Sequence, residues 1–219
     1  MSNEIVTKVL QLLDEHYPQH VCFLDYNKPY ELLLATILSA QCTDVQVNRV
    51  TEKLFVKYTS LEDFAGANLV EMEEDVRTTG FFHNKAKSII LTARALLERH
   101  AGELPSDIGN LTKLPGVGRK TANLVRGHIF GIPSIVVDTH VGRVSRRLGF
   151  TKHTDPKRVE YDLMEVLPES HWIRYNTQII ALGREICSAR KPSCDACFLA
   201  EQCATRHLHI RESEEDQDE

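Results

Sequence analysis

Residues 114–122 carry the sequence Leu-Pro-Gly-Val-Gly-Arg-Lys-Thr-Ala, and this stretch decides the fold. Helical periodicity precedes it near residues 107–113 and follows it as an amphipathic pattern through about Phe130. Gly116 and Gly118 permit positive φ angles and let a phosphate approach the backbone, and the second helix offers free N–H groups at its start. The stretch therefore predicts a helix-hairpin-helix that holds DNA phosphates without reading base sequence. The alternative is a plain turn between two helices, which the short pattern Pro-Gly-x-Gly would be enough to form.

Helical periodicity also dominates the rest of the chain, and no run alternates convincingly at period two. One face of an N-terminal helix would carry Ile5, Val9, Leu12 and Leu13. Further helix starts are signalled by capping or first-turn residues: Pro29, Ser60 with Asp63, Asn68 with Glu71, and Asp155 with Pro156. The strand-like run at 135–137 is too short to found a sheet, so we expect an all-α protein of about nine or ten short helices.

The charge of the chain is concentrated in two places. The net charge is −5, but residues 211–219 hold six acids and one arginine, so the other 210 residues are neutral. Within that neutral body, residues 113–147 carry seven Lys and Arg against Asp138 alone. A basic face of this kind binds phosphates whatever the overall charge. Taken by itself, the charge pattern fits a solvated helical face equally well.

Length and composition exclude several classes of protein. A chain of 219 residues with 42% hydrophobic content can bury a core, and it fits one compact domain or two lobes that share an interface. No stretch reaches the roughly 18 uncharged residues of a membrane span, and no targeting segment is evident. We therefore expect a soluble globular protein of the cytosol with no membrane partner.

Lys120 falls in the first turn of the helix that follows the hairpin. There the positive end of the helix dipole and the adjacent Arg119 disfavour an ammonium and help to free a neutral amine. A neutral lysine can attack the C1′ carbon of a nucleotide, displace the base and leave a Schiff base with the opened sugar, which then permits β-elimination. Residue type alone leaves a second interpretation open, in which Lys120 is one more phosphate contact.

Asp138 lies where an apolar run ends and an Arg-bearing helix begins, in the segment Val-Val-Asp-Thr-His at 136–140. An aspartate in this position is typical of a helix N-cap. A carboxylate held by backbone N–H groups also stays ionised, and near C1′ it could stabilise developing positive charge or help to deprotonate the nucleophile. Capping and catalysis are compatible.

Four of the six cysteines fall within 17 residues near the C-terminus, at positions Cys187, Cys194, Cys197 and Cys203. In a chain that is not secreted, this clustering favours metal ligation over disulfides, and Cys22 and Cys42 are expected to be free thiols. Four thiolates suit either zinc or a [4Fe–4S] cluster. Zinc sites usually show two CxxC pairs and only one is present, so the spacing leans toward iron–sulfur without deciding the question.

Four segments together resemble the helix-hairpin-helix glycosylases of the endonuclease III family. They are residues 114–123, residues 137–140, the four-cysteine segment at 187–203, and Leu-Leu-Leu-Ala-Thr-Ile-Leu-Ser-Ala-Gln-Cys-Thr-Asp at 32–44. They follow the family's order and approximate spacing over nearly the whole chain.

The resemblance implies two helical lobes with a catalytic cleft between them. One lobe would span residues 22–132 and end in the helix-hairpin-helix. The other would combine residues 1–21 with 133–211 and hold a [4Fe–4S] cluster. Residues 212–219 would form a disordered acidic tail.

The resemblance also assigns roles position by position. Lys120 matches the Schiff-base lysine, Asp138 the catalytic aspartate, and the four clustered cysteines the cluster ligands. Gln41 matches a side chain that fills the space left by a flipped nucleotide, and Phe81 a wedge against the opposite strand. The implied DNA contacts are Gln41, Phe81, Gly116, Gly118, Arg119, His140 and Arg143. Without the resemblance, Gln41 would be a solvated helix end and Phe81 a core aromatic.

The implied function is that of a DNA N-glycosylase and abasic-site lyase of base excision repair. It would remove oxidised pyrimidines from damaged duplex DNA through the lysine Schiff base and cleave 3′ to the abasic site. We expect a monomer in the cytoplasm, associated with the nucleoid in a bacterium. Arg126, Gly127 and His128 depart from the family's pattern, which bears on substrate range. The alternatives are a mismatch-specific thymine or uracil glycosylase on the same fold and a non-catalytic iron–sulfur DNA-binding module.

Overall fold

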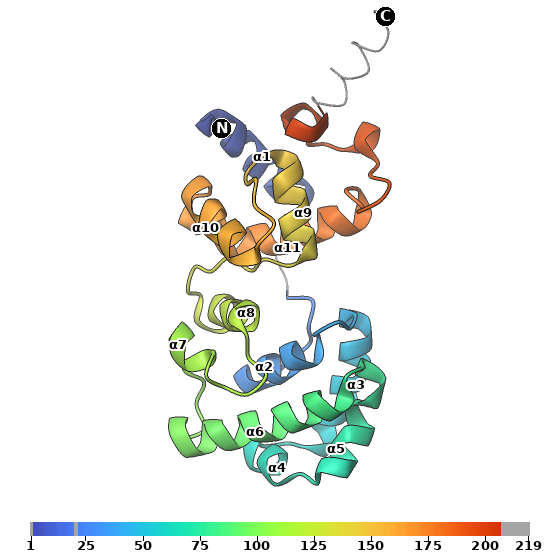
Figure 1. The fold of residues 1–219 in the computed structure, drawn as a ribbon, viewed down its shortest axis with the longest axis vertical. Helices are drawn as coiled ribbons and strands as arrows, with labels where there is room; N and C mark the ends of the chain where they lie inside the picture. Colours follow the sequence, from blue (N-terminus) through green and yellow to red (C-terminus); the bar gives the residue numbers. More distant parts are fainter. Residues whose placement is uncertain (1, 20–21, 207–219) are drawn as a thin grey trace, which may run out of the picture. The chain divides into compact units, whose positions relative to one another are not determined.

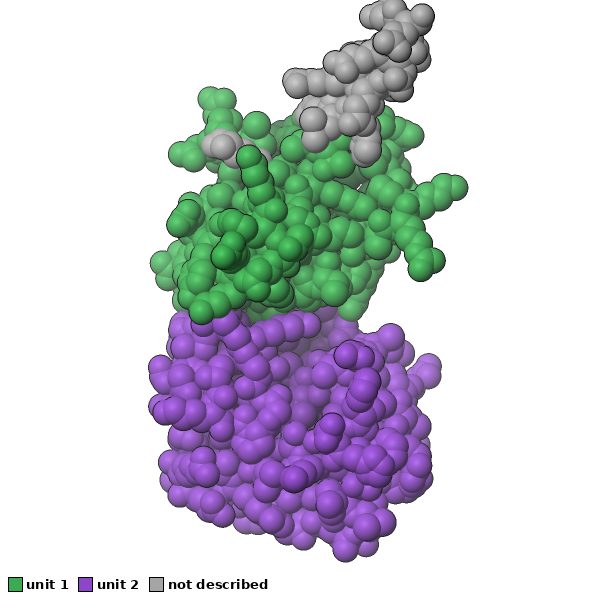
Figure 2. Space-filling model, in the orientation of Figure 1, with its two compact units in different colours: residues 1–21, 133–219 green, residues 22–132 purple. Residues whose placement is uncertain are grey.

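The computed structural model describes residues 2–19 and 22–206. Those residues contain eleven α-helices, four short 3₁₀ helices and no strand, so the all-α prediction is confirmed, with slightly more helices than expected. The chain divides into two compact units, residues 22–132 and residues 1–21 with 133–219, each with a hydrophobic core of its own (Figure 1, Figure 2). The acidic tail expected at 212–219 lies outside the described residues. None of the helices in the described ranges has both the length and the apolar character that a membrane crossing requires.

The unit of residues 22–132 is built around one helix that is buried from its third residue onward. Its elements are α2 (Pro29–Leu38), α3 (Asp44–Lys57), α4 (Leu61–Gly66), α5 (Leu69–Val76), η1 (Arg77–Thr79), α6 (Phe82–His100), α7 (Ile108–Leu111) and α8 (Arg119–Phe130). Every residue of α2 from Glu31 to Leu38 is buried, and α3, α6 and α8 contact it. A helix surrounded by others on all sides is apolar all round. The buried Glu31 carboxylate is satisfied because it accepts backbone N–H groups of Asn27 at 2.7 Å and Lys28 at 3.0 Å.

The helix starts that capping residues predicted are confirmed. At α4, the Ser60 hydroxyl accepts the Asp63 N–H at 3.1 Å and the Asp63 carboxylate accepts the Ser60 N–H at 3.0 Å, which is a complete capping box. The Asn68 side chain caps α5 by accepting the N–H groups of Val70 and Glu71, and α10 begins at Pro156 behind the cap Asp155. These bonds satisfy N–H groups that have no partner inside the helix.

The second unit packs the N-terminal helix against helices from the far end of the chain. Its elements are α1 (Asn3–His16), α9 (Thr139–Leu148), α10 (Pro156–Val166), η2 (Glu169–His171), α11 (Trp172–Glu185), η3 (Cys194–Ala196) and η4 (Ala200–Gln202). The face expected for α1 was partly wrong, because its buried residues are Val6, Val9, Leu10 and Leu13. Ile5 is 38% exposed. The buried residues follow the spacing i, i+3, i+4, i+7 from Val6. Packing against the other helices of the unit decides which of two overlapping apolar stripes faces inward.

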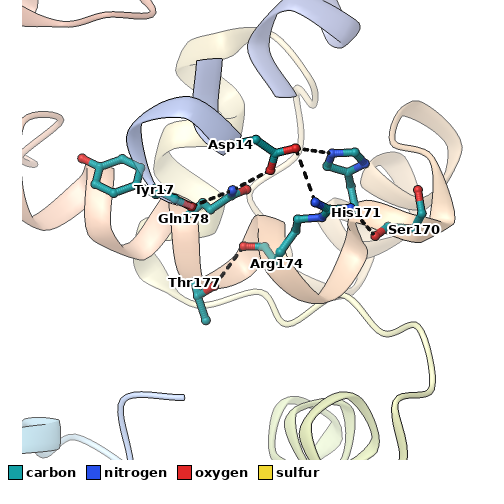
Figure 3. Close-up of polar contacts among 7 residues, drawn as sticks. All are labelled: Asp14, Tyr17, Ser170, His171, Arg174, Thr177 and Gln178. Carbon is teal, nitrogen blue, oxygen red and sulfur yellow. Dashed lines mark hydrogen bonds and ion pairs between the residues drawn. The ribbon is translucent and has the colours of Figure 1, made fainter. Parts of the chain in front are cut away.

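A polar cluster joins α1 to α11 across more than 150 residues of sequence (Figure 3). The Asp14 carboxylate accepts the Gln178 amide at 2.9 Å and the Arg174 guanidinium at 3.4 Å, and the His171 ring lies 3.2 Å away. Burial by itself would raise the pKa of Asp14, but the hydrogen bonds from Gln178 and His171 and the charge of Arg174 hold that pKa below its ordinary value. The ionised carboxylate therefore helps to fix α1 in its unit.

Candidate functional site

The hairpin before α8 depends on Gly116. Its φ is +75°, and a Cβ built there would lie 2.8 Å from the Cβ of Ser88, so both the backbone angle and the space demand glycine. The Thr92 hydroxyl donates to the Pro115 carbonyl at 2.7 Å and ties the hairpin to α6. The expectation of positive φ holds for Gly116 only. Gly118 has φ −90° because it is the N-cap of α8, where extended backbone is usual.

Lys120 is the second residue of α8, and its side chain is exposed. The helix buries Ala122, Asn123, Val125 and Gly127 on its inner side. Arg119, the first residue of α8, is half-buried. The hairpin and the first turn of α8 thus present an accessible amine beside backbone N–H groups that have no partner within the helix.

The departures from the family pattern within α8 are in part structural. Arg126 donates from Nε to the Ser106 carbonyl at 3.2 Å, which ties α8 to the segment before α7. Gly127 is buried, and His128 is half-buried. The bond to Ser106 therefore gives Arg126 a structural role, because it braces the hairpin.

Asp138 is the N-cap of α9. Its backbone is extended, with φ −106° and ψ −172°, and its carboxylate accepts the Val141 N–H at 2.8 Å. The capping interpretation is confirmed, and the carboxylate keeps a second oxygen for other contacts. Asp138 belongs to the unit of residues 1–21 and 133–219, whereas Lys120 belongs to the unit of residues 22–132.

His140 and Arg143 pack closely against α11 within the same unit. The Arg143 guanidinium donates to the Cys187 carbonyl at 2.9 Å and the Gly183 carbonyl at 3.1 Å, and its Nη2 lies 3.2 Å from His140 Nδ1. Burial lowers the pKa of His140, the charge of Asp138 opposes that shift, and Arg143 and Arg184 add to it. A Cβ on Gly183 would lie 2.6 Å from His140 Nδ1, so the ring packs there only because residue 183 is glycine.

Arg147, one turn beyond Arg143 on α9, holds the start of the cysteine loop. It donates to the Ser188 carbonyl at 2.7 Å and the Ala189 carbonyl at 2.9 Å, and it lies 3.2 Å from the Cys187 sulfur. Sequence reasoning placed Arg147 only in a general basic segment. Its spacing of four residues from Arg143 is the signal that could have identified a shared role.

The four clustered cysteines line one cavity of about 240 Å³, together with Arg147 and Ile186. No group of three or more His, Cys, Asp or Glu side chains in residues 2–19 and 22–206 is arranged to hold a single metal ion. Four thiols around one cavity match the ligand set of an iron–sulfur cluster. All six cysteines are free of disulfides, including Cys22 and Cys42.

Gln41 and Phe81 occupy short connections in the unit of residues 22–132. Gln41 follows α2 and is exposed, and Phe81 precedes α6 with 63% of its surface exposed. The core-aromatic interpretation of Phe81 is therefore wrong. Both residues have positive φ, 53° for Gln41 and 49° for Phe81. Residue type alone contained no signal for this backbone conformation.

Comparison with known proteins agrees with these local features. Residues 34–169 match the HhH-GPD superfamily base excision DNA repair protein family, and residues 187–203 match the iron–sulfur binding domain of endonuclease III. Endonuclease III of Synechocystis sp. is 50% identical over 198 residues, which are 90% of each chain. Endonuclease III of Escherichia coli is 40% identical over 196 residues, which are 90% of this chain and 93% of that protein.

Solved structures give the same result. The structure of a trapped endonuclease III–DNA covalent intermediate matches with a TM-score of 0.90 at 41% identity. The match covers 96% of this chain and 99% of the chain in that structure. A thermostable thymine-DNA glycosylase has a TM-score of 0.85 at 22% identity, which shows the fold alone. From its motifs, its helices and these relatives, the chain belongs to the endonuclease III family of helix-hairpin-helix base excision DNA repair proteins.

Proposed function

We propose that this protein removes oxidised pyrimidines from duplex DNA and cleaves the strand at the resulting abasic site, with Lys120 as the nucleophile. It is a base excision repair glycosylase and abasic-site lyase, as its family membership establishes. The observation that carries the residue assignment is an exposed lysine in the first turn of α8, directly behind the Gly116 hairpin. A covalent DNA intermediate trapped in a relative at 41% identity supports a nucleophilic mechanism.

The proposed reaction begins when the neutral Lys120 Nζ attacks C1′ and the C1′–N bond to the base breaks. The base leaves with its electron pair and takes up the proton that Nζ loses as the new N–C1′ bond forms. The ring opens to an imine between Nζ and C1′, and this imine acidifies C2′. Loss of a C2′ proton then expels the 3′ phosphate by β-elimination, and water hydrolyses the imine to release the enzyme.

Asp138 would act on the same carbon from its capping position. One carboxylate oxygen accepts the Val141 N–H at 2.8 Å, so the group is oriented before substrate arrives. A fixed carboxylate near C1′ stabilises the positive charge that develops as the base departs. The remaining proposed DNA contacts are the Gly116 and Gly118 hairpin, Arg119, His140, Arg143, Gln41 and Phe81. Arg143 also braces the segment at Cys187, because its guanidinium donates to the carbonyls of Gly183 and Cys187.

The cysteine loop holds a [4Fe–4S] cluster, and we assign Cys187, Cys194, Cys197 and Cys203 as its ligands. When bound, the cluster supplies a rigid centre for a loop that has only two short 3₁₀ turns between residues 194 and 202. The exposed Arg190 and Lys191 of that loop would then be held toward DNA phosphate. Cys194→Ser should lower soluble yield and DNA affinity together, and normal duplex affinity without the cluster would contradict this role.

The decisive experiment uses a duplex with one thymine glycol and borohydride quenching. Wild-type protein should give both strand cleavage and a covalent protein–DNA adduct. Lys120→Ala should abolish the adduct and retain most of the duplex affinity. Lys113→Ala is the matched control, because Lys113 is an exposed lysine of the same hairpin that binds only Asn110, and it should still form the adduct. An adduct that survives Lys120→Ala would refute the assignment.

The substrate class needs a separate measurement. A panel of duplexes containing oxidised pyrimidines, uracil or thymine opposite guanine, and abasic sites should show the highest excision rate for the oxidised pyrimidines. A preference for thymine opposite guanine would favour the mismatch glycosylase instead. We further propose that the protein acts as a monomer in the cytoplasm, and sedimentation of the free protein tests the monomer.

A further inference from the structure

The two connections that carry Gln41 and Phe81 share an unusual backbone conformation. Only three non-glycine residues of the described ranges have positive φ: Gln41, Phe81 and Ala101. Ala101 ends α6, where left-handed backbone is common. Phe81 is instead the N-cap of α6, a position that is usually extended, and its side chain makes no cap hydrogen bond. Other residues must therefore hold the strained backbone of Gln41 and Phe81 in place.

The exposed side chains do not supply that support. Phe81 is 63% exposed, so packing of its ring against the core cannot hold the backbone in place. Gln41 is exposed as well. The strained conformations persist because neighbouring residues restrain the main chain.

The first restraint is a hydrogen bond between the two connections. Gln46 donates from its side-chain amide to the Thr78 hydroxyl at 2.8 Å. Gln46 lies in the first turn of α3, and its N–H is accepted by the cap Thr43 at 3.3 Å, two residues after Gln41. Thr78 lies in η1, three residues before Phe81. The bond thus joins the segment after Gln41 to the segment before Phe81.

The second restraint is the buried Lys85. The side chain is 4% exposed, and its ammonium donates to the Thr79 carbonyl at 2.7 Å. The backbone N–H of the same residue donates to the Phe81 carbonyl at 3.1 Å, so Lys85 holds the chain on both sides of Gly80. Burial lowers the pKa of Lys85. Lys85 therefore restrains the connection that carries Phe81, and the Gln46–Thr78 bond ties that connection to the one that carries Gln41.

We propose that Lys85 and the Gln46–Thr78 pair are positioning residues that join the two connections into one pre-organised unit for base flipping. This inference rests on the proposed roles of Gln41 and Phe81. Gln41 would fill the space of the flipped nucleotide at the same moment that Phe81 enters the opposite strand. Because both backbones are restrained during folding, little ordering remains to oppose flipping. Separate, relaxed connections would have to order themselves on the DNA.

The predicted signature is a defect confined to substrates that must be unstacked. Expelling a stacked base costs more than expelling a damaged or unpaired one, and an abasic nucleotide has no base to expel. Loss of one restraining hydrogen bond should slow removal of thymine glycol by about tenfold. Cleavage of a preformed abasic duplex should change by no more than about twofold, because its chemistry uses Lys120 without unstacking.

The experiment compares Thr78→Val, Gln46→Met and Lys85→Met in single-turnover assays on both duplexes. A 2-aminopurine opposite the lesion reports flipping by stopped-flow fluorescence. The expected result is a slower fluorescence rise and slower excision with abasic cleavage preserved. Thr7→Val is the matched control, since it removes an exposed hydroxyl that binds only Asn3 of its own helix, and it should change neither rate.

A coupling test separates positioning from mere stability. In the wild-type background, Gln41→Ala and Phe81→Ala should be non-additive in excision rate, whereas in the Thr78→Val background their effects should add. Equal losses on both duplexes, or excision at the wild-type rate in all three variants, would overturn the inference. If Lys85→Met does not fold, the two surface-proximal variants still decide the matter. A wild-type protein with no excision at all would instead overturn the proposed function.

Discussion

Replacing Gly116 by alanine should destabilise the unit of residues 22–132 strongly, although the change adds a single methyl group. The φ of +75° places alanine in the left-handed region, which costs about 1–2 kcal/mol for a residue with a Cβ. The new Cβ would also lie 2.8 Å from both Cβ and Oγ of Ser88, and overpacking of this kind costs about 1–3 kcal/mol. The sum is a loss of about 2–5 kcal/mol in the free energy of unfolding.

Gly118→Ala is the matched comparison within the same hairpin. Gly118 has φ −90° and no atom within 4 Å of a built Cβ, so only the poorer N-cap propensity of alanine counts and the loss should stay below about 1 kcal/mol. Its effect should appear instead in DNA affinity, because the methyl group stands where a phosphate would approach α8. The two variants thus separate the hairpin's folding role from its binding role.

Urea unfolding followed by helical circular dichroism measures the stability change, and the melting temperature of Gly116→Ala should fall by roughly 4–20 °C. Adding Ser88→Gly removes both clashing atoms. The double variant should then recover about 1–3 kcal/mol relative to the sum of the single changes, which is the steric part. The part due to φ should remain. Equal losses for Gly116→Ala and Gly118→Ala, or no coupling to Ser88, would refute this reasoning.

Three further predictions follow from the other unit. Arg147→Gln removes a charged contact 3.2 Å from the Cys187 sulfur, so the cluster's visible absorbance should decay faster in air than in wild type; an unchanged decay rate would contradict this. Gly183→Ala would place a Cβ 2.6 Å from His140 Nδ1, so it should lower the free energy of unfolding by about 1–3 kcal/mol in denaturant titrations. The pKa of Asp14 is lowered by folding, so its stabilisation is present above pH 3.8 and disappears as the pH falls below that value. Asp14→Asn should therefore flatten the pH dependence of stability in acid, by less than about 1 kcal/mol because the side chain is 37% exposed.

Local signals identified the features that depend on neighbouring residues in sequence. The capping box of Ser60 and Asp63, the start of α10 at Pro156 and the end of α8 at Phe130 all follow from caps and turn residues. The hairpin at Gly116 follows for the same reason, since a positive φ is available to glycine at little cost.

Other features of the candidate site depend on contacts between distant parts of the chain. Arg143 was predicted as a DNA contact and Arg147 only as a source of positive charge. Their guanidinium groups also hold carbonyls about 40 residues away around Cys187. Arg126 was unexplained until its bond to the Ser106 carbonyl was known. The inner face of α1 was right at Val9 and Leu13 only, because two overlapping apolar stripes share those residues.

The sequence by itself determined an all-α protein, its glycine hairpin, the place of Lys120 in the first turn of the next helix, and its four cysteines, because helix caps, glycine backbone angles and ligand spacing are local properties. Only the tertiary structure decided that Phe81 is exposed and left-handed, that Lys85 is buried beside it, and that Gln46 reaches Thr78. The physical reason is that burial and side-chain hydrogen bonds between remote segments exist only after packing, and many sequences with the same local pattern could pack differently.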